Sequence, residues 1–205
     1  MKNKKGFTLV ELMIVIAILA ILAAIVIFAL NPAELFRRAR DSQRMSDLRV
    51  LSSAISYYLA DDSTPTLDGS SNTLCAGGSG NDTIFATAAN STVPASFVTW
   101  VNTTTRTVSG SGWIKIDFTQ SGANSAPIGQ LPMDPANGGI TASPSTQYTF
   151  ACNTTLDFEL NANMESVNYK ASEDDDGGDL DTVYEIGTKV VGLLPNTTTN
   201  FYTNH

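Results

Sequence analysis

The feature that most constrains this chain is an almost wholly apolar run over residues 7–30, in which Glu11 is the single charged residue. At 1.5 Å per residue, this run would form a helix about 36 Å long. That length is enough to cross the roughly 30 Å hydrocarbon core of a bilayer. A secretory signal peptide has a shorter apolar core that ends at small residues. The run therefore predicts a membrane-spanning helix.

Glu11 is expensive in such a helix, because a carboxylate at the bilayer centre costs about 2.5–3.5 kcal/mol on insertion scales. It lies one helical turn after Phe7. If the chain were cut after Gly6, the new amine of Phe7 would be a cation complementary to this carboxylate, within one helix or between staggered neighbours. Such a pair specifies packing register, because slippage leaves a charge unpaired. A plain membrane anchor would not require Glu11.

The stretch Lys4-Lys5-Gly6-Phe7-Thr8-Leu9-Val10-Glu11 resembles the cleavage and methylation signal of bacterial type IV prepilins and type II secretion pseudopilins. The resemblance implies that a prepilin peptidase and methyltransferase cuts between Gly6 and Phe7 and methylates Phe7. It also implies that Glu11 guides self-association into a helical filament, served by an assembly-platform membrane protein and an ATPase. Residues 1–6 would then be a cleaved leader, and 7–30 the helix of the membrane and of the filament core.

The charges around the run oppose the usual topology rule, which places Lys and Arg on the cytoplasmic side. Three lysines precede the run and five arginines follow it: Lys2, Lys4 and Lys5, then Arg37, Arg38, Arg40, Arg44 and Arg49. The resemblance places the leader in the cytoplasm and the large C-terminal part outside. We adopt this second topology as our expectation.

The second half of the long helix is predicted over residues 31–60. Asn31-Pro32 should kink or break the helix, because proline removes a backbone donor and clashes with the preceding turn. Beyond it, one stripe of apolar residues recurs at helical spacing and is expected to pack in a core: Leu48, Leu51, Ile55, Tyr58 and Leu59.

Residues 61–205 are predicted to form one β-rich head. Apolar residues alternate in three short segments, as in half-buried strands: Ile114, Ile116 and Phe118; Tyr148, Phe150 and Cys152; Leu156, Phe158 and Leu160. Turn formers at 153–155 separate the last two segments. A helix followed by hairpins predicts an α+β fold, with an antiparallel sheet laid on the long helix.

The head is acidic, with four Lys or Arg against sixteen Asp or Glu from Asp61 onward. Lys and Arg contacts supply most affinity for nucleic acid, so no nucleic-acid partner is indicated. This charge suits a domain outside the cytoplasm. The two cysteines, Cys75 and Cys152, are either buried thiols or a disulfide, and an oxidising compartment favours the disulfide.

Two loops of the head stand out. Residues 131–135, Leu-Pro-Met-Asp-Pro, form a rigid turn by composition and partly resemble a Pro-x-Asp-Pro loop of secretion pseudopilins. Residues 173–181 form an acidic loop beside two glycines, and calcium prefers such oxygen-rich, flexible loops. The alternatives are a solvated charge run, without cofactor, or a calcium site, whose expected ligands are Asp174, Asp176, Asp179 and Asp181.

Catalysis is not expected. The single histidine is His205, and the sequence holds neither a phosphate-binding glycine loop nor zinc-ligand spacing. The predicted function is a structural subunit of a type IV pilus-like filament. The alternative is a type II secretion pseudopilin, and a tip adhesin or a DNA-uptake pilin ranks below both. The protein should cross the membrane once before assembly and then lie in an extracytoplasmic or cell-surface filament.

Overall fold

The computed structural model describes residues 6–69, 71–75, 83–87, 99–120, 126–136 and 147–193. Gly6 is the one residue of the predicted leader that the structure describes. Residues 1–5 and His205 lie outside the described residues. The chain divides into two compact units, residues 1–37 and 38–205. We call the second unit the head; it includes most of the second helix as well as residues 61–205.

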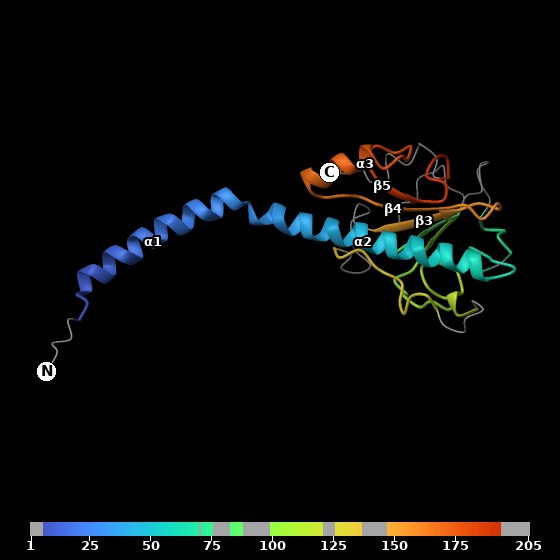
Figure 1. Cartoon of the computed structure of the whole chain (residues 1–205), viewed down its shortest axis with the longest axis horizontal. Helices are drawn as coiled ribbons and strands as arrows, with labels where there is room; N and C mark the ends of the chain where they lie inside the picture. Colours follow the sequence, from blue (N-terminus) through green and yellow to red (C-terminus); the bar gives the residue numbers. More distant parts are fainter. Residues whose placement is uncertain are drawn as a thin grey trace. The chain divides into compact units, whose positions relative to one another are not determined.

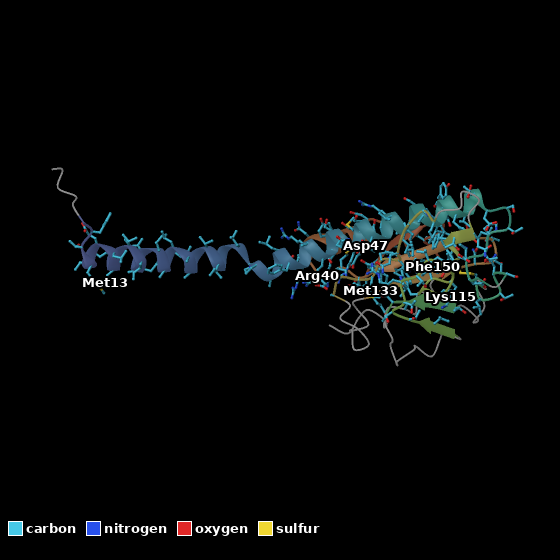
Figure 2. All side chains as sticks on the ribbon, turned by 90° about the horizontal axis from the view of Figure 1, so that it is seen from below. Met13, Arg40, Asp47, Lys115, Met133 and Phe150 are labelled. Carbon is cyan, nitrogen blue, oxygen red and sulfur yellow. A yellow bond between two sulfur atoms is a disulfide. The ribbon has the colours of Figure 1, made fainter. Side chains whose placement is uncertain are left out.

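Helix α1 spans Leu9–Leu30 and belongs to the first unit. Apolar side chains project from it on all sides (Figure 2), and those of Leu12, Ile18 and Leu30 are each more than half exposed. Among the described residues, Leu9–Ile27 is the one stretch long and apolar enough to cross a membrane. The helix ends where predicted, because Asn31 takes a left-handed backbone conformation (φ 41°) and Pro32 begins the next helix.

Helix α2 spans Pro32–Asp61, and from Arg38 onward it belongs to the head. The head also contains α3 (Val167–Asp174), a 3₁₀ turn η1 (Phe118–Gln120) and a five-stranded sheet in the order β2-β1-β3-β4-β5. The strands are β1 (Thr83–Ala86), β2 (Thr99–Asn102), β3 (Tyr148–Cys152), β4 (Phe158–Ala162) and β5 (Tyr184–Gly187).

The fold is α+β, as predicted, with four strands paired antiparallel. The predicted hairpin is present, since β3 and β4 pair from Tyr148–Ala162 to Cys152–Phe158 across the turn at 153–157. The edge strand β2 differs from the expectation, because it pairs parallel to β1.

The predicted strand through Ile114, Ile116 and Phe118 is wrong, although all three side chains are fully buried as the alternation indicated. The backbone there bonds to its own preceding loop: the amides of Gly110 and Phe118 donate to the carbonyls of Ile116 and Val108. Alternating burial arises here from an irregular segment that crosses the core. Period-two burial therefore did not require pairing with the sheet.

The core of the head lies between α2 and one face of the sheet, where the helix runs alongside β3 and β4 (Figure 1). The predicted stripe is confirmed, because Leu48, Leu51, Ile55 and Tyr58 are at most 2% exposed and Leu59 packs against the same cluster. From the sheet, Phe150 and Phe158 contribute rings whose centroids lie 6.4 Å apart.

A charged cluster is buried beside this core and centres on Arg44, whose side chain is fully buried. Its guanidinium donates to Asp134 through Nε (2.6 Å) and Nη2 (3.0 Å), to Asp41 through Nη1 (2.7 Å), and to Glu165 through Nη2 (2.6 Å). Arg40 also pairs with Glu165. One turn of α2 thereby holds both the 131–135 loop and the segment that leads into α3.

Asp41 extends the cluster to the backbone before α3, because its carboxylate accepts the amides of Glu165 (3.0 Å) and Ser166 (2.7 Å). Burial alone would lower the pKa of Arg44, but hydrogen bonds and attraction from Asp134 and Glu165 raise it above its ordinary value. Burial likewise opposes ionisation of Glu165, yet Arg40 and Arg44 hold its pKa below the usual range. Arg44 and Glu165 are therefore both charged at physiological pH.

We predict that Arg44→Met destabilises the head by about 3–5 kcal/mol, because it leaves buried carboxylates without their cation. The measurement is thermal or denaturant unfolding of the detergent-solubilised protein. Arg49→Met is the matched control, since this arginine is exposed on the same helix and should change stability by less than about 0.5 kcal/mol. Equal effects of the two substitutions would contradict a structural role for the cluster.

Candidate processing and assembly site

The predicted cleavage site lies in a non-helical, exposed segment ahead of α1. Gly6, Phe7 and Thr8 precede the first helical residue, and Phe7 is 91% exposed. A Cβ built on Gly6 would meet no atom within 4 Å. A peptidase must bind its substrate in an extended form, which a helix would not offer. The peptide bond between Gly6 and Phe7 is therefore open to such an enzyme.

Glu11 closes a reciprocal hydrogen-bonded cap with Thr8 at the start of α1. The carboxylate oxygen Oε2 accepts the Thr8 amide (2.8 Å) and the Thr8 hydroxyl (2.9 Å), and the Glu11 amide donates to that hydroxyl oxygen (3.3 Å). This is the capping box, which satisfies amides that the first helical turn leaves unpaired. Glu11 thus fixes the start of the helix shortly after the predicted cleavage site.

Thr8 was missed as a functional residue, although the sequence carried its signal. A Ser or Thr followed three residues later by Glu is the capping-box pattern, and Thr8-Leu9-Val10-Glu11 fits it. Both hydrogen bonds to the carboxylate end on Oε2. Among the hydrogen bonds of the described residues none reaches Oε1, so this oxygen can accept a donor from another molecule.

A disulfide joins Cys75 and Cys152 within the core of the head, with their Cα atoms 4.8 Å apart. Cys75 is fully buried and Cys152 is 6% exposed. The bridge closes a loop between residues 77 positions apart and ties the segment after α2 to the end of β3. In the chain-entropy account, a loop of this length stabilises the fold by about 4–5 kcal/mol.

The four expected calcium ligands do not converge. Asp174 ends α3 and Asp181 is exposed. Asp176 accepts the amides of Gly178 (2.8 Å) and Glu185 (2.6 Å), so its two oxygens already organise the loop. Across the described residues, no group of three or more carboxylate, thiol or imidazole side chains could hold a metal ion. Calcium binding stays a prediction from the sequence.

A buried pair of carboxyl groups lies next to this loop, on neighbouring strands and on the same sheet face. Glu159 of β4 is fully buried and Glu185 of β5 is 2% exposed. Burial and a hydrogen bond with Glu159 raise the pKa of Glu185 to about 9. Its Oε2 accepts the Leu180 amide (3.0 Å), and its carboxylate lies so close to Gly178 that a Cβ on that residue would clash with it. At neutral pH Glu185 therefore keeps its proton.

The comparisons with known proteins agree with the N-terminal analysis. Residues 1–27 match the family model described as the prokaryotic N-terminal methylation motif, which is the signal of type IV pilin and pseudopilin precursors. This match confirms the predicted signal and points to a structural subunit with a membrane-anchored precursor. No curated protein and no solved structure matches the chain.

We predict that the head becomes less stable as the pH rises from about 4.5 towards 9. In this window Glu185 is protonated in the folded chain and ionised in the unfolded chain, so a rise in pH favours unfolding. Melting temperatures measured across this range, with a chelator present, test the sign. Glu185→Gln should flatten the profile, whereas the exposed control Asp181→Asn should leave its slope unchanged. A wild-type profile that rises with pH would refute the raised pKa of Glu185.

Proposed function

We propose that the chain is a structural subunit of a type IV pilus-like filament, assembled from the membrane by packing of its N-terminal helices. The observation that carries the proposal is the junction of an exposed Gly6–Phe7 bond with an apolar helix capped by Glu11. The stretch Leu9–Ile27 of that helix is not buried within the chain. Such a helix needs lipid before assembly and neighbouring helices afterwards.

Cleavage would change the chemistry of this junction. The amide of Phe7 would become a cationic amine, only four residues from the carboxylate of Glu11. Oε2 of Glu11 is engaged with Thr8, while Oε1 remains open to the amine of an adjoining subunit. In a bundle of low dielectric, the pairing of that amine with the carboxylate would select one register over its neighbours. Filament assembly would then be coupled to processing.

A type II secretion pseudopilin is the second candidate, and the 131–135 loop favours it. Asp134 within that loop is 3% exposed and is bound by Arg44 of α2. Two further contacts hold the loop: Trp113 Nε1 donates to the Pro132 carbonyl (2.9 Å), and Arg106 Nε to the Leu131 carbonyl (2.7 Å). The side chains of Arg44, Arg106 and Trp113 thus fix the loop in one conformation. A fixed loop at this place supports the partial resemblance to the pseudopilin Pro-x-Asp-Pro loop.

The two candidates differ in where the filament acts. Deletion of the gene should abolish sheared surface fibres if the chain is a pilus subunit. If it is a pseudopilin, deletion should instead retain exported proteins in the periplasm and leave surface fibres intact. In either case we propose the same partners: a prepilin peptidase, an assembly-platform protein and its ATPase.

We predict that the mature N-terminus is N-methylated Phe7. Removal of the leader takes away Lys2, Lys4 and Lys5 and makes the chain more negative by three charges. N-terminal mass spectrometry of membrane and sheared-fibre fractions measures this directly. Intact Met1 in assembled material would refute processing and, with it, the filament proposal.

We predict that Glu11→Val abolishes assembly without impairing membrane insertion. Valine makes the span more apolar. However, it leaves the Phe7 amine of a neighbour unpaired, at a cost of about 3–5 kcal/mol, so fibre yield should fall more than about tenfold. Glu11→Gln should be intermediate, because an amide accepts a hydrogen bond without charge. Membrane level, cleavage and fibre yield are measured separately.

The control for this experiment is Thr8→Ala, which removes the capping hydroxyl and keeps the carboxylate. Loss of a cap costs about 0.5–2 kcal/mol, and we expect most fibre yield to survive it. If Thr8→Ala were as damaging as Glu11→Val, the cap would account for the phenotype. Normal fibres from Glu11→Val would show that no charge pair organises the filament.

We predict, from the sequence, that millimolar calcium raises the melting temperature of the chain, because a ligand that binds only the folded state stabilises it. Binding would require the loop between Asp174 and Asp181 to close around the ion. The double substitution of Asp176 and Asp179 by Ala should remove the calcium effect. Identical melting with calcium and with a chelator would leave Asp176 solely as the acceptor of two loop amides.

A further inference from the structure

The start of α2, just after the predicted membrane helix, carries exposed apolar side chains next to a positively charged one. We call residues 32–37 the exit segment. Leu35 and Phe36 are 50% and 67% exposed, and the side chain of Arg37 is 52% exposed. The single acid of the segment, Glu34, lies 3.9 Å from Arg37. Two large apolar side chains beside an arginine are an unfavourable surface to leave in water.

The depth of the exit segment follows from the lengths of the helices. The 22 residues of α1 rise about 33 Å, close to the roughly 30 Å of a hydrocarbon core. Arg37 follows Leu30 by seven residues, so its Cα lies within about 10 Å of the end of α1 along a helical path. Headgroups occupy about the first 5–7 Å beyond the core on each side. An arginine can direct its long side chain back towards them.

We propose that the exit segment binds anionic phospholipid headgroups in the leaflet where α1 ends. Arg37 would pair with lipid phosphate, while Phe36 and Leu35 enter the boundary between headgroups and acyl chains. Aromatic and aliphatic residues opposite Lys or Arg are the composition of segments that lie in this boundary. The inference rests on the membrane anchoring of the precursor and holds for a pilus subunit and for a pseudopilin alike.

The same binding accounts for Arg37, one of the five arginines that the topology rule does not explain. They follow the span on the side of the acidic head, which an anionic surface repels. Attraction at Arg37, with Arg38 next in sequence, would offset that repulsion close to the lipid. A subunit leaving the membrane for a filament would have to break this contact, so anionic lipid would stabilise the unassembled pool.

The test uses the full-length chain in lipid nanodiscs, with spin-labelled phosphatidylglycerol and phosphatidylcholine as probes of headgroup preference. Wild-type protein should prefer phosphatidylglycerol, and high salt should weaken that preference. Arg37→Gln should reduce it by up to about fivefold, which corresponds to about 1 kcal/mol for one arginine near the surface. The leader lysines contribute an equal background to both proteins.

The matched control is Arg49→Gln, which removes the same charge from an exposed site twelve residues further along α2. That site lies about 18 Å from Arg37 along the helix, beyond the screening length at 0.1 M salt. Arg49→Gln should therefore leave the lipid preference unchanged. Equal effects of the two substitutions, or none from Arg37→Gln, would overturn the proposal.

A second measurement separates this inference from the membrane anchoring on which it rests. Resistance of the protein to alkaline carbonate extraction reports insertion of α1 and should be the same in wild type, Arg37→Gln and Arg49→Gln. Insertion without any phosphatidylglycerol preference would refute headgroup binding alone. Extraction of the wild-type chain by carbonate would refute the anchored precursor, and headgroup binding with it.

Discussion

The head depends on the buried guanidinium of Arg44, because it is the point where three segments distant in sequence meet. A buried arginine is tolerated only if its charge and its donors are matched, and Asp41, Asp134 and Glu165 supply that match. Asp41 comes from the preceding turn of α2, while the other two come from the 131–135 loop and from the approach to α3. Removing the cation would deprive three buried or partly buried carboxylates of this partner at once. The cluster therefore favours one arrangement of α2, the 131–135 loop and the segment before α3. The adjoining apolar core fills volume but has no comparable directional requirement.

The sequence predicted those parts of the head whose burial follows a regular period. The α2 stripe, the β3–β4 hairpin and the break at Asn31-Pro32 all depend on local rules, and the structure contains each of them. The segment through Ile114 shows the limit of such rules, because alternating burial also arises in an irregular crossing of the core. The parallel edge strand β2 and the raised pKa of Glu185 beside Glu159 depend on contacts between distant segments, which periodicity does not reveal.

The candidate functional residues also fall into those that the sequence predicted and those that it did not. The methylation signal and Glu11 were predictable because the cost of a carboxylate in an apolar run demands an explanation from sequence alone. The role of Arg44 was not, since an arginine on a charged helix face resembles its exposed neighbours until the fold brings Asp134 and Glu165 to it. The acidic loop has the composition of a calcium site, yet Asp176 turns its oxygens to backbone amides. Composition alone could not distinguish these two uses of one carboxylate.

Glu11 caps α1 in the structure and would pair with a neighbouring subunit in the proposed filament, and an apolar residue could do neither. It caps α1 through Thr8 and so sets the start of the helix at Leu9, which keeps the predicted cleavage bond between Gly6 and Phe7 out of regular structure. After cleavage, the same carboxylate would face a cation that did not exist before. The cap thus offsets part of the free-energy cost of placing this carboxylate in the membrane. Pairing with the Phe7 amine of a processed neighbour would offset more of that cost, but only during assembly. On this argument an unprocessed chain enters the membrane but gains no register-specific contact, so the chemistry of one peptide bond would decide when subunits can assemble.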